Sequence, residues 1–430
     1  MTDFERTLRA ELDDVPVADP HTHLRASKPS ADNLADLALY HHVWVELVSA
    51  GMSPTAATNA GLPHELADPG MEPLDRVRAA LPYLRHIRST TCGHLLRTIL
   101  EDLYGVPEGE LTEANVDQVF ALAADRARNP AWTSELLKER CHIHASVTFE
   151  SDEAPPWDAS MSRGVERDLN LVDGKRPPRD KLVEMEQGLN TELRTADDLG
   201  RALHELGVTY ARRGIRAVGL WLLPHLEFSN PTSREVTTVL RRARDGKQLT
   251  HDDLSAFTSY SLRCMLLGLR GSQVPTIQVI VGAEVLPPHR SLTHWSPEFP
   301  GSLGRIAGEF DVFRFDCSSA SDLHTQDLAI LAKHVPNISV CGYWWHTLYP
   351  HYIRKSIETR LDIVPANKVI AFFSDAYHAE WCYPKLKLVK RIFGDVLLDR
   401  VERGLLTQPI ALSLIRETFL DNPTRIYGLH

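Results

Sequence analysis

The chain has 430 residues, a hydrophobic fraction of 43% and a formal net charge of −10. This length is sufficient for a barrel of about 250 residues with a sizeable insertion, or for two to three smaller domains. The acidic balance and the lack of a long basic run argue against nucleic acid as a partner, and against attraction to an anionic membrane.

The sequence carries no signal for export or membrane insertion. No apolar run reaches the roughly 18–20 residues that span a bilayer, and the polar stretch from Met1 to Arg6 lacks the apolar core of a secretion signal. The six cysteines are scattered, which is typical of small core residues in a reducing compartment. We therefore expect a cytoplasmic protein that acts on a small molecule, and the sequence leaves a homo-oligomer open.

A short helix and a turn precede the first expected strand, which ends in two histidines. The apolar run from Val15 to Ala18 leads into His21 and His23, which are separated by one residue. Side chains two apart on a strand point the same way, so both imidazoles would project toward one point. Neutral imidazoles bind zinc-like ions, although so short a motif also occurs by chance and needs structural context.

Residues 28–140 have helical periodicity. Apolar residues recur at helical spacing in 34–41 and in 95–103, and turn signals at 61–63 and 68–70 separate such segments. The pattern predicts a mostly helical insertion after the first strand, which would roof a metal site at the end of that strand.

From residue 141 onward, strand-like and helical segments alternate. Strands are expected at 141–149, 215–223, 275–281, 310–315, 338–341 and 369–373, and helices at 197–213, 255–269, 323–333 and after 384. Residues 152–180 indicate a loop. The alternation predicts an α/β protein with a (β/α)8 TIM barrel formed by residues 1–27 and 141–430. An open doubly wound sheet is the alternative, but it needs a glycine-rich turn where the two histidines lie.

Catalytic side chains of such a barrel lie at the carboxyl ends of its strands. Several chemistry-bearing residues occupy that position in the expected order: His21, His23, His225, Asp316, Trp344, Trp345 and Asp375. Asp375 follows the last expected strand and supplies a carboxylate. With the two histidines it would give three metal ligands and leave open positions, as in a catalytic rather than a structural metal site.

The order of these motifs resembles a known family. The segment 341–345, with its paired tryptophans, is followed further along by Phe373-Ser374-Asp375, and a short helix precedes the two histidines. This pattern is similar to the uronate isomerase branch of the amidohydrolase superfamily. The resemblance implies a metal held by His21, His23 and Asp375, and interconversion of the aldehyde and ketone forms of a hexuronate through an enediol.

Three positions depart from the pattern of that family. Tyr377 stands two residues after the metal-binding Asp, where the family has Arg; Ile280 stands where its fifth strand has His; and an Arg near its third strand has no match. Losing guanidinium groups removes bidentate recognition of an acidic sugar. A hydrolase or lyase acting on a neutral or aromatic substrate is therefore the alternative reaction, and a non-catalytic metal-stabilised binding protein is a third hypothesis.

Three residues are predicted to be catalytic. Asp375 would bind metal through one oxygen and move a proton with the other, because a base must reach the carbon-bound proton. His346 would donate a proton, or be an ordinary loop histidine. Tyr377 would replace the missing Arg as a neutral donor, or serve only in packing.

Five residues are predicted to contact substrate. Trp344 and Trp345 would line the cavity wall, where aromatic rings exclude water and stack on a substrate ring. His225 and His378 are weaker candidates, and Arg314 would anchor an anion unless it lies in a buried ion pair. The expected cofactor is one divalent ion; the two imidazoles and the carboxylate favour zinc, and manganese, iron or nickel fit the same donors.

Overall fold

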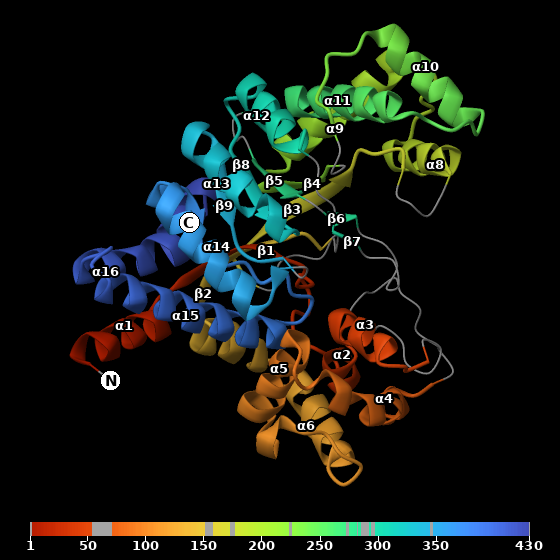
Figure 1. Ribbon diagram of the computed structural model, residues 1–430. Coiled ribbons are helices and arrows are strands. Elements are labelled where there is room, and N and C mark those ends of the chain that lie inside the picture. The colour runs from red at the N-terminus through yellow and green to blue at the C-terminus, as the bar shows by residue number, and fades with distance from the viewer. Residues whose placement is uncertain are drawn as a thin grey trace.

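A parallel sheet lies at the centre of the protein, with helices around it (Figure 1). The structure is a computed structural model that describes residues 2–53, 71–150, 158–172, 177–222, 226–271, 275–281, 283–284, 292–293, 297–344 and 347–429. Within these ranges the architecture is that of an α/β protein with a TIM-barrel-like, curled sheet, which confirms the predicted α/β class; a closed (β/α)8 barrel stays a prediction.

Eight strands form the sheet, each parallel to its neighbours. In spatial order they are β1 (Val17–Thr22), β2 (Ile143–Thr148), β3 (Met161–Asp168), β4 (Ala217–Trp221), β5 (Thr276–Val281), β8 (Phe315–Ser319), β9 (Ile338–Cys341) and β10 (Val369–Ile370). A separate antiparallel pair consists of β6 (Ala283–Glu284) and β7 (Leu292–Thr293). Because spatial order follows chain order, successive strands are joined by crossovers, as in a barrel.

The first strand and the segment after the last strand also meet. The backbone N–H of His23 donates to the carbonyl of Ala376 at 3.0 Å, and the N–H of Asp375 donates to the carbonyl of His21 at 2.9 Å. These two bonds bring the carboxyl end of β1 against residues that follow β10. The curl of the sheet therefore places residues from opposite ends of the chain side by side.

Helices occupy most of the described chain between β1 and β2. After α1 (Asp3–Asp14), which precedes β1, they are α2 (Leu34–Ala38), α3 (His41–Ser49), α4 (Pro73–Ile87), α5 (Thr91–Thr98), α6 (Val116–Arg128) and α7 (Trp132–Ser134), with short helical turns at 99–103, 107–109 and 135–140. Their apolar residues share one core with α1 and the C-terminal helices. That these helices form an insertion of their own, bounded at 28 and 140, stays a prediction.

The remaining helices pack against the sheet or extend from it (Figure 1). They are α8 (Pro178–Leu189), α9 (Ala196–Arg212), α10 (Ser233–Arg244), α11 (His251–Gly268), α12 (Phe299–Glu309), α13 (Thr325–His334), α14 (Pro350–Ile363), α15 (Ala379–Glu402), α16 (Gln408–Arg416) and α17 (Asn422–Tyr427), with turns at 322–324, 366–368 and 417–421.

Local sequence signals explain where several of these helices begin and how closely they pack. α9, α10 and α11 each start with a capping box, in which a Thr side chain and an acidic residue three positions later satisfy each other's backbone N–H groups. α9 and α11 touch through glycines: a Cβ on Gly207 would lie 2.5 Å from the carbonyl oxygen of Met265, and one on Gly268 would lie 2.1 Å from that of His204. Larger residues at these positions would push the two helices apart.

One loop prediction and one strand prediction are wrong. Residues 152–180, predicted to be a loop, contain β3, because charged residues on both sides of Gly164 hide its alternating pattern. The strand predicted at 310–315 begins only at Phe315, since Phe310 ends α12 and Phe313 is buried without belonging to a strand. Asp316 is therefore the second residue of β8 and does not follow its carboxyl end.

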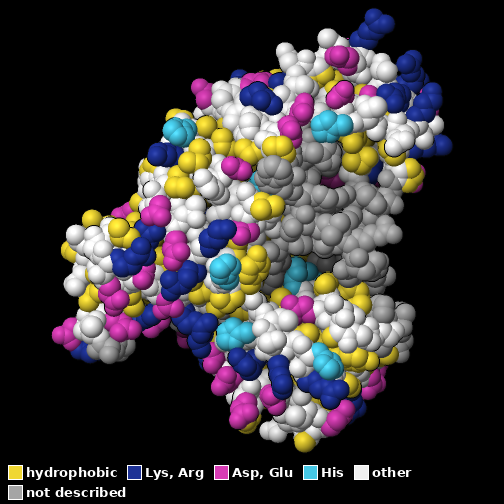
Figure 2. Space-filling view, in the orientation of Figure 1, with side chains coloured by type: hydrophobic (Ala, Val, Ile, Leu, Met, Phe, Trp, Pro, Cys, Tyr) yellow, Lys and Arg dark blue, Asp and Glu magenta, His cyan; other side chains and the backbone are white. Residues whose placement is uncertain are grey.

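The visible surface is mixed in character. Figure 2 shows Lys and Arg side chains interspersed with Asp and Glu over much of the face, with basic side chains gathered around α10. Large apolar side chains that are exposed, such as Leu323, Leu405 and Ile410, lie on different elements. Among the described helices none has the length and apolar character needed to cross a membrane.

Candidate metal centre

Two imidazoles converge at the carboxyl end of β1. His21 is the penultimate residue of β1, and His23 is the first residue after this strand. The two residues are two positions apart, so their side chains lie on the same side of the chain. Their ring centroids are 5.1 Å apart. The Nε2 atom of His21 lies 3.1 Å from Oδ1 of Asp375, and Nε2 of His23 lies 3.3 Å from the same oxygen. The structure thus brings together all three residues predicted to bind metal.

Asp375 reaches this position through an unusual backbone. Its φ is +51°, in the left-handed region that Asp tolerates better than most residues with a side chain. The bond from its N–H to the carbonyl of His21 fixes the turn, and the Tyr40 hydroxyl lies 3.5 Å from the Asp375 carbonyl oxygen. Backbone strain of this kind persists where the surrounding structure imposes it, commonly at functional sites.

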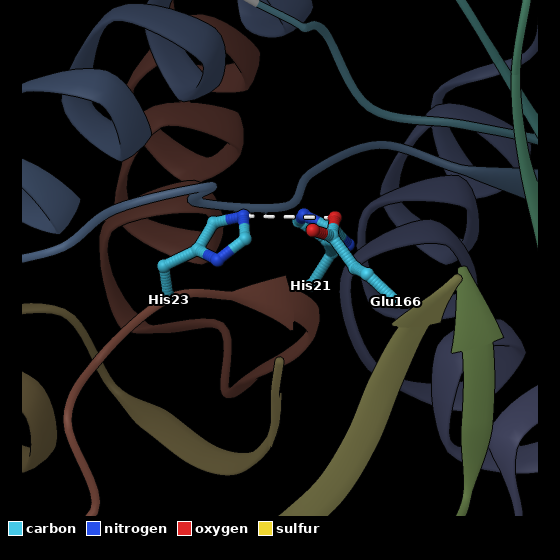
Figure 3. Close-up of side chains that lie close together, drawn as sticks. All are labelled: His21, His23 and Glu166. Carbon is cyan, nitrogen blue, oxygen red and sulfur yellow. Dashed lines mark ion pairs between the residues drawn. The ribbon is translucent and has the colours of Figure 1, made fainter. Parts of the chain in front are cut away.

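Glu166 of β3 also lies beside the two histidines (Figure 3). One ligand atom each from His21, His23 and Glu166 all lie within 4.8 Å of one another, and Glu166 Oε1 is 3.9 Å from Nε2 of His23. The sequence reasoning missed Glu166 together with its strand. Its signal was the alternation of Gly164, Glu166 and Asp168 along one face of β3, which the many charges obscured.

The donors fit a divalent cation. Ligand atoms about 2.1 Å from a tetrahedral zinc ion lie about 3.4 Å from one another, close to the two separations between imidazole nitrogen and carboxylate oxygen. The other oxygen of Asp375, Oδ2, is buried and has no hydrogen-bond partner among the described residues. A buried carboxylate oxygen without a donor is costly unless something positive lies near it. His21, His23, Asp375 and Glu166 would hold such an ion.

The charges of the cluster are strongly coupled. Burial opposes a charged imidazole at His23, but the hydrogen bond to Asp375 and the charges of Glu166, Asp375 and Glu150 outweigh it and raise the pKa of His23 to about 9. Burial also opposes ionisation of Asp375, yet its bonds to both histidines hold its pKa well below its usual range. The cluster is therefore rich in negative charge and attracts cations.

Two buried charged residues, Lys385 and Asp19, contact Ser374, the residue before Asp375. Lys385 of α15 is fully buried and donates from Nζ to the carbonyl of Ser374 at 2.9 Å. Burial lowers its pKa to about 8, against the opposing charges of Asp375 and Asp19. Asp19, also buried, accepts from the N–H of Ser374 at 2.9 Å. Both contacts hold the residue that precedes Asp375 and so position its side chain.

Aromatic rings wall the cluster. Tyr377 stacks on His23 with ring centroids 4.6 Å apart and planes 5° from parallel, and Phe149 packs on His21 at 4.4 Å. His41, at the start of α3, lies edge-on to Tyr377 at 5.2 Å. Tyr377 is thus placed beside the candidate ligands, as a residue with a role there must be.

The other predicted site residues have different fates. Trp344 is buried and packs edge-on against Trp221 at 5.2 Å, and His378 is buried at the start of α15 with its ring 6.3 Å from that of Tyr40. Three further predictions lie outside the described residues: His225, Trp345 and His346. The structure says nothing of them.

Arg314 lies far from its predicted role. It precedes β8 and does not lie within a strand, and its Nη1 donates to the carbonyls of Arg425 at 2.7 Å and Ile426 at 3.1 Å. This position is at the amino ends of the strands, whereas His23 and Asp375 are at the carboxyl ends. Contrary to expectation, Arg314 binds the end of α17 at the opposite side of the sheet.

Comparison with known proteins supports the fold. No family model matches the sequence, and no curated protein matches it. Solved structures do match: uronate isomerase from Thermotoga maritima has a TM-score of 0.79 at 16% identity, covering 99% of this chain and 98% of that one. Glucuronate isomerase from Caulobacter crescentus has a TM-score of 0.80 at 17% identity, covering 99% and 94%.

A proposed metal-dependent hydrolase from Lactobacillus casei is also similar, with a TM-score of 0.61 at 12% identity, covering 98% of this chain and 97% of that one. At such identities, structural likeness establishes the fold and leaves the reaction open. The chain therefore has the fold of the uronate isomerases over almost its whole length, with a cluster of potential metal ligands at the carboxyl ends of its strands.

Proposed function

We propose that this protein is a metal-dependent enzyme that interconverts the aldose and ketose forms of a hexuronate. The observation that carries the proposal is the convergence of His21, His23 and Asp375 at the carboxyl ends of the first and last strands. Catalytic groups of barrel enzymes lie there. The fold is shared with solved uronate isomerases, whose reaction has the same requirement for a base beside a carbonyl.

One divalent ion, held by His21, His23 and Asp375 with Glu166 beside them, would polarise the carbonyl and the neighbouring hydroxyl of the substrate. Zinc suits two imidazoles and a carboxylate, and manganese, iron or nickel would fit the same donors. The ring of Tyr377 stacks on that of His23 and covers one of its faces.

Asp375 is the residue to which we assign proton transfer. Its Oδ1 faces both imidazoles, and its buried Oδ2 has no partner among the described residues. As a base it would take the proton from the carbon next to the aldehyde, which produces an enediol. It would return that proton to the former aldehyde carbon, while a hydroxyl proton moves between the two oxygens, so that atoms and charge balance.

The remaining site predictions are proposals of the same kind. Tyr377 and His346 would donate hydrogen bonds or a proton to substrate oxygens, and Trp344 and Trp345 would line the cavity together with His225 and His378. Tyr377 has the best support, because it is adjacent to His23. Action on a small molecule in the cytoplasm fits this function.

A second candidate is a hydrolase or lyase of the same fold. Glu150 and Glu166 add negative charge near His23, which disfavours a substrate carboxylate, and Tyr377 replaces an arginine that would attract one. The similarity to the proposed hydrolase from Lactobacillus casei points the same way. Asp375 or Glu166 would then deprotonate a water molecule that attacks a neutral substrate.

Proton exchange at carbon separates the two candidates. Metal-replete protein would be incubated with D-glucuronate and D-galacturonate in heavy water and followed by NMR. We expect deuterium at the carbon next to the carbonyl, formation of ketose, loss of both on chelation and recovery on adding metal. Absence of exchange in protein shown to carry its ion would contradict the isomerase and favour hydrolysis of a neutral amide, ester or lactone.

A further inference from the structure

A chain of hydrogen bonds runs through the interior of the sheet, away from the metal centre. His21 Nδ1 lies 2.7 Å from Oε1 of Gln278 on β5, and Gln278 Nε2 donates to the hydroxyl of Tyr427 at 2.6 Å. That hydroxyl donates to Oδ2 of Asp316 on β8 at 2.5 Å. All four side chains are at least nine-tenths buried. These hydrogen bonds connect His21, a candidate metal ligand, to Tyr427 at the end of α17.

The direction of these bonds follows from one backbone group. Gln278 Nε2 donates to the carbonyl of Pro20 at 2.8 Å, and a carbonyl can only accept. The amide nitrogen of Gln278 therefore faces Pro20 and Tyr427, and its oxygen faces His21. An amide oxygen is only an acceptor, so Nδ1 of His21 must carry a hydrogen. Nε2, which faces Asp375, is left to bind a cation once it has lost its own proton.

At the other end of this series of hydrogen bonds, the surroundings of Tyr427 keep its phenol protonated and able to accept from Gln278. Ser339 Oγ donates to the other oxygen of Asp316 at 2.7 Å, so that carboxyl group is held from two sides. Burial and the adjacent Asp316 keep the pKa of Tyr427 well above its usual range, so the phenol keeps its proton. Its hydrogen points to Asp316 and its lone pair remains for Gln278.

Helix α17 places Tyr427 at the amino ends of the strands. The Thr276 hydroxyl donates to the carbonyl of Ile426 at 2.7 Å, and Arg314 donates to the carbonyl of Arg425. Gly428 ends the helix with a φ of +63°, and Leu429 after it is buried. These contacts anchor the helix end against β5 and β8, and leave the phenol fixed inside the sheet.

We propose that Gln278 is a positioning residue that makes His21 bind metal through Nε2, and that Tyr427 of the C-terminal helix holds Gln278 in the required orientation. The proposal rests on the metal centre proposed above. Partners of this kind fix the tautomer of a metal-ligating histidine, and losing them typically costs 10-fold to 100-fold in metal affinity. If these hydrogen bonds only filled the interior, removing them would affect stability, but it would not change which ring nitrogen of His21 binds the metal.

Zinc affinity and the protonation of His21 test the proposal. Metal-free protein would be titrated with zinc in competition with a chelator, and nitrogen NMR of the zinc-loaded protein would identify the protonated ring nitrogen. We expect Gln278→Leu to weaken zinc binding by about 10-fold to 100-fold and to abolish the distinct Nδ1–H signal. Tyr427→Phe, which removes only the hydroxyl, should weaken binding in the same direction by less, and it keeps the test available if the leucine variant does not fold.

Two further variants separate positioning from packing. Gln278→Glu keeps an oxygen that can accept from Nδ1 of His21, so it should restore most of the affinity that Gln278→Leu loses. Ser261→Ala removes a buried hydroxyl on α11 that belongs neither to these hydrogen bonds nor to α17, so zinc affinity should be unchanged. Wild-type affinity and an unchanged Nδ1–H signal in folded Gln278→Leu or Tyr427→Phe protein would overturn the proposal. If the wild-type chain bound no divalent ion, the metal centre itself would be overturned.

Discussion

The two ends of the parallel strands are built differently. At the carboxyl ends, His21, His23 and Asp375 crowd together, Asp375 has a left-handed backbone, and its Oδ2 lacks a partner among the described residues. At the amino ends, α17 covers the sheet, and Tyr427 and Asp316 are buried in hydrogen bonds. Changes at the first end should therefore affect chemistry, and changes at the second should mainly affect stability, except at the Tyr427 hydroxyl, which holds Gln278 against His21.

The largest expected effect is that of Asp375→Asn. The amide keeps the shape but cannot act as a base, and it is a poorer metal ligand, so hexuronate turnover should fall by about 10²-fold to 10⁴-fold. The variant should still fold cooperatively, since the amide fills the same volume and the backbone bond from residue 375 to His21 is kept. Steady-state kinetics and thermal melting check this. The same substitution at Asp322, a half-buried residue that pairs with Lys355, should leave turnover unchanged; equal loss in both variants would remove Asp375 from the mechanism.

At the amino ends, Ile338→Ala should act in the opposite way. Ile338 begins β9 and is fully buried, so its truncation should lower the free energy of unfolding by about 2–5 kcal/mol. Turnover per folded molecule should remain that of the wild type. Denaturant unfolding and kinetics below the transition measure both. Ile330→Ala, at an exposed position on α13, is the matched control; a large loss of turnover in Ile338→Ala would break the division between the two ends.

Near the carboxyl ends of the strands, the hydrogen bonds of Glu380 make the stability of the fold depend on pH. Glu380 of α15 accepts from the Trp132 indole at 2.9 Å and from the Ala31 N–H at 3.0 Å. Burial, opposed by these two bonds, raises the pKa of Glu380 from 4.5 to about 7. The folded state therefore binds this proton more tightly than the unfolded state. The resulting stability is complete below pH 4.5 and is lost as pH rises through 7.

We expect Glu380→Gln to remove this dependence. Between pH 5 and 7.5, the stability of the wild type relative to the variant should fall by most of about 3 kcal/mol. Denaturant unfolding across that range measures it, with Glu402→Gln, on the exposed end of α15, as a control. A constant difference between wild type and Glu380→Gln would mean that the carboxyl group does not titrate in this window.

The smallest predicted effect is that of Glu166→Gln. The Glu166 side chain is 31% exposed, and its Oε1 is farther from His23 than Asp375 is. It should contribute as an outer partner of the ion, so metal affinity should fall by about 10-fold with the fold intact. Isothermal titration of the metal-free variant tests this. Unchanged affinity would show that Glu166 is only a neighbour of the site.

Sequence patterns predicted the parts of the site that local structure controls. The apolar run before His21 and His23 indicated a strand with both rings on one side, and 338–341 matched β9 at both ends. Buried parallel strands have continuous apolar runs, which makes them visible in a single sequence. The family resemblance joined Asp375 to the histidines across the length of the chain.

Other features depend on contacts that no local pattern reveals. Gln278 and His21 are 257 positions apart and meet only because the sheet curls. β3 was missed because a half-buried strand can carry many charges, and Glu166 was missed with it. Arg314 was misplaced because the strand beside it was predicted several residues too early, which moved the side chain from the edge of the sheet to its interior.

The most direct test is calorimetric titration of metal-free protein with zinc and with manganese. The account predicts one tight site per chain in the wild type and loss of that site in His23→Ala and Asp375→Ala. His144→Ala, a histidine exposed on β2, should bind as the wild type does. No binding by the wild type, or equal binding by all variants, would contradict a metal centre at the carboxyl ends of the strands.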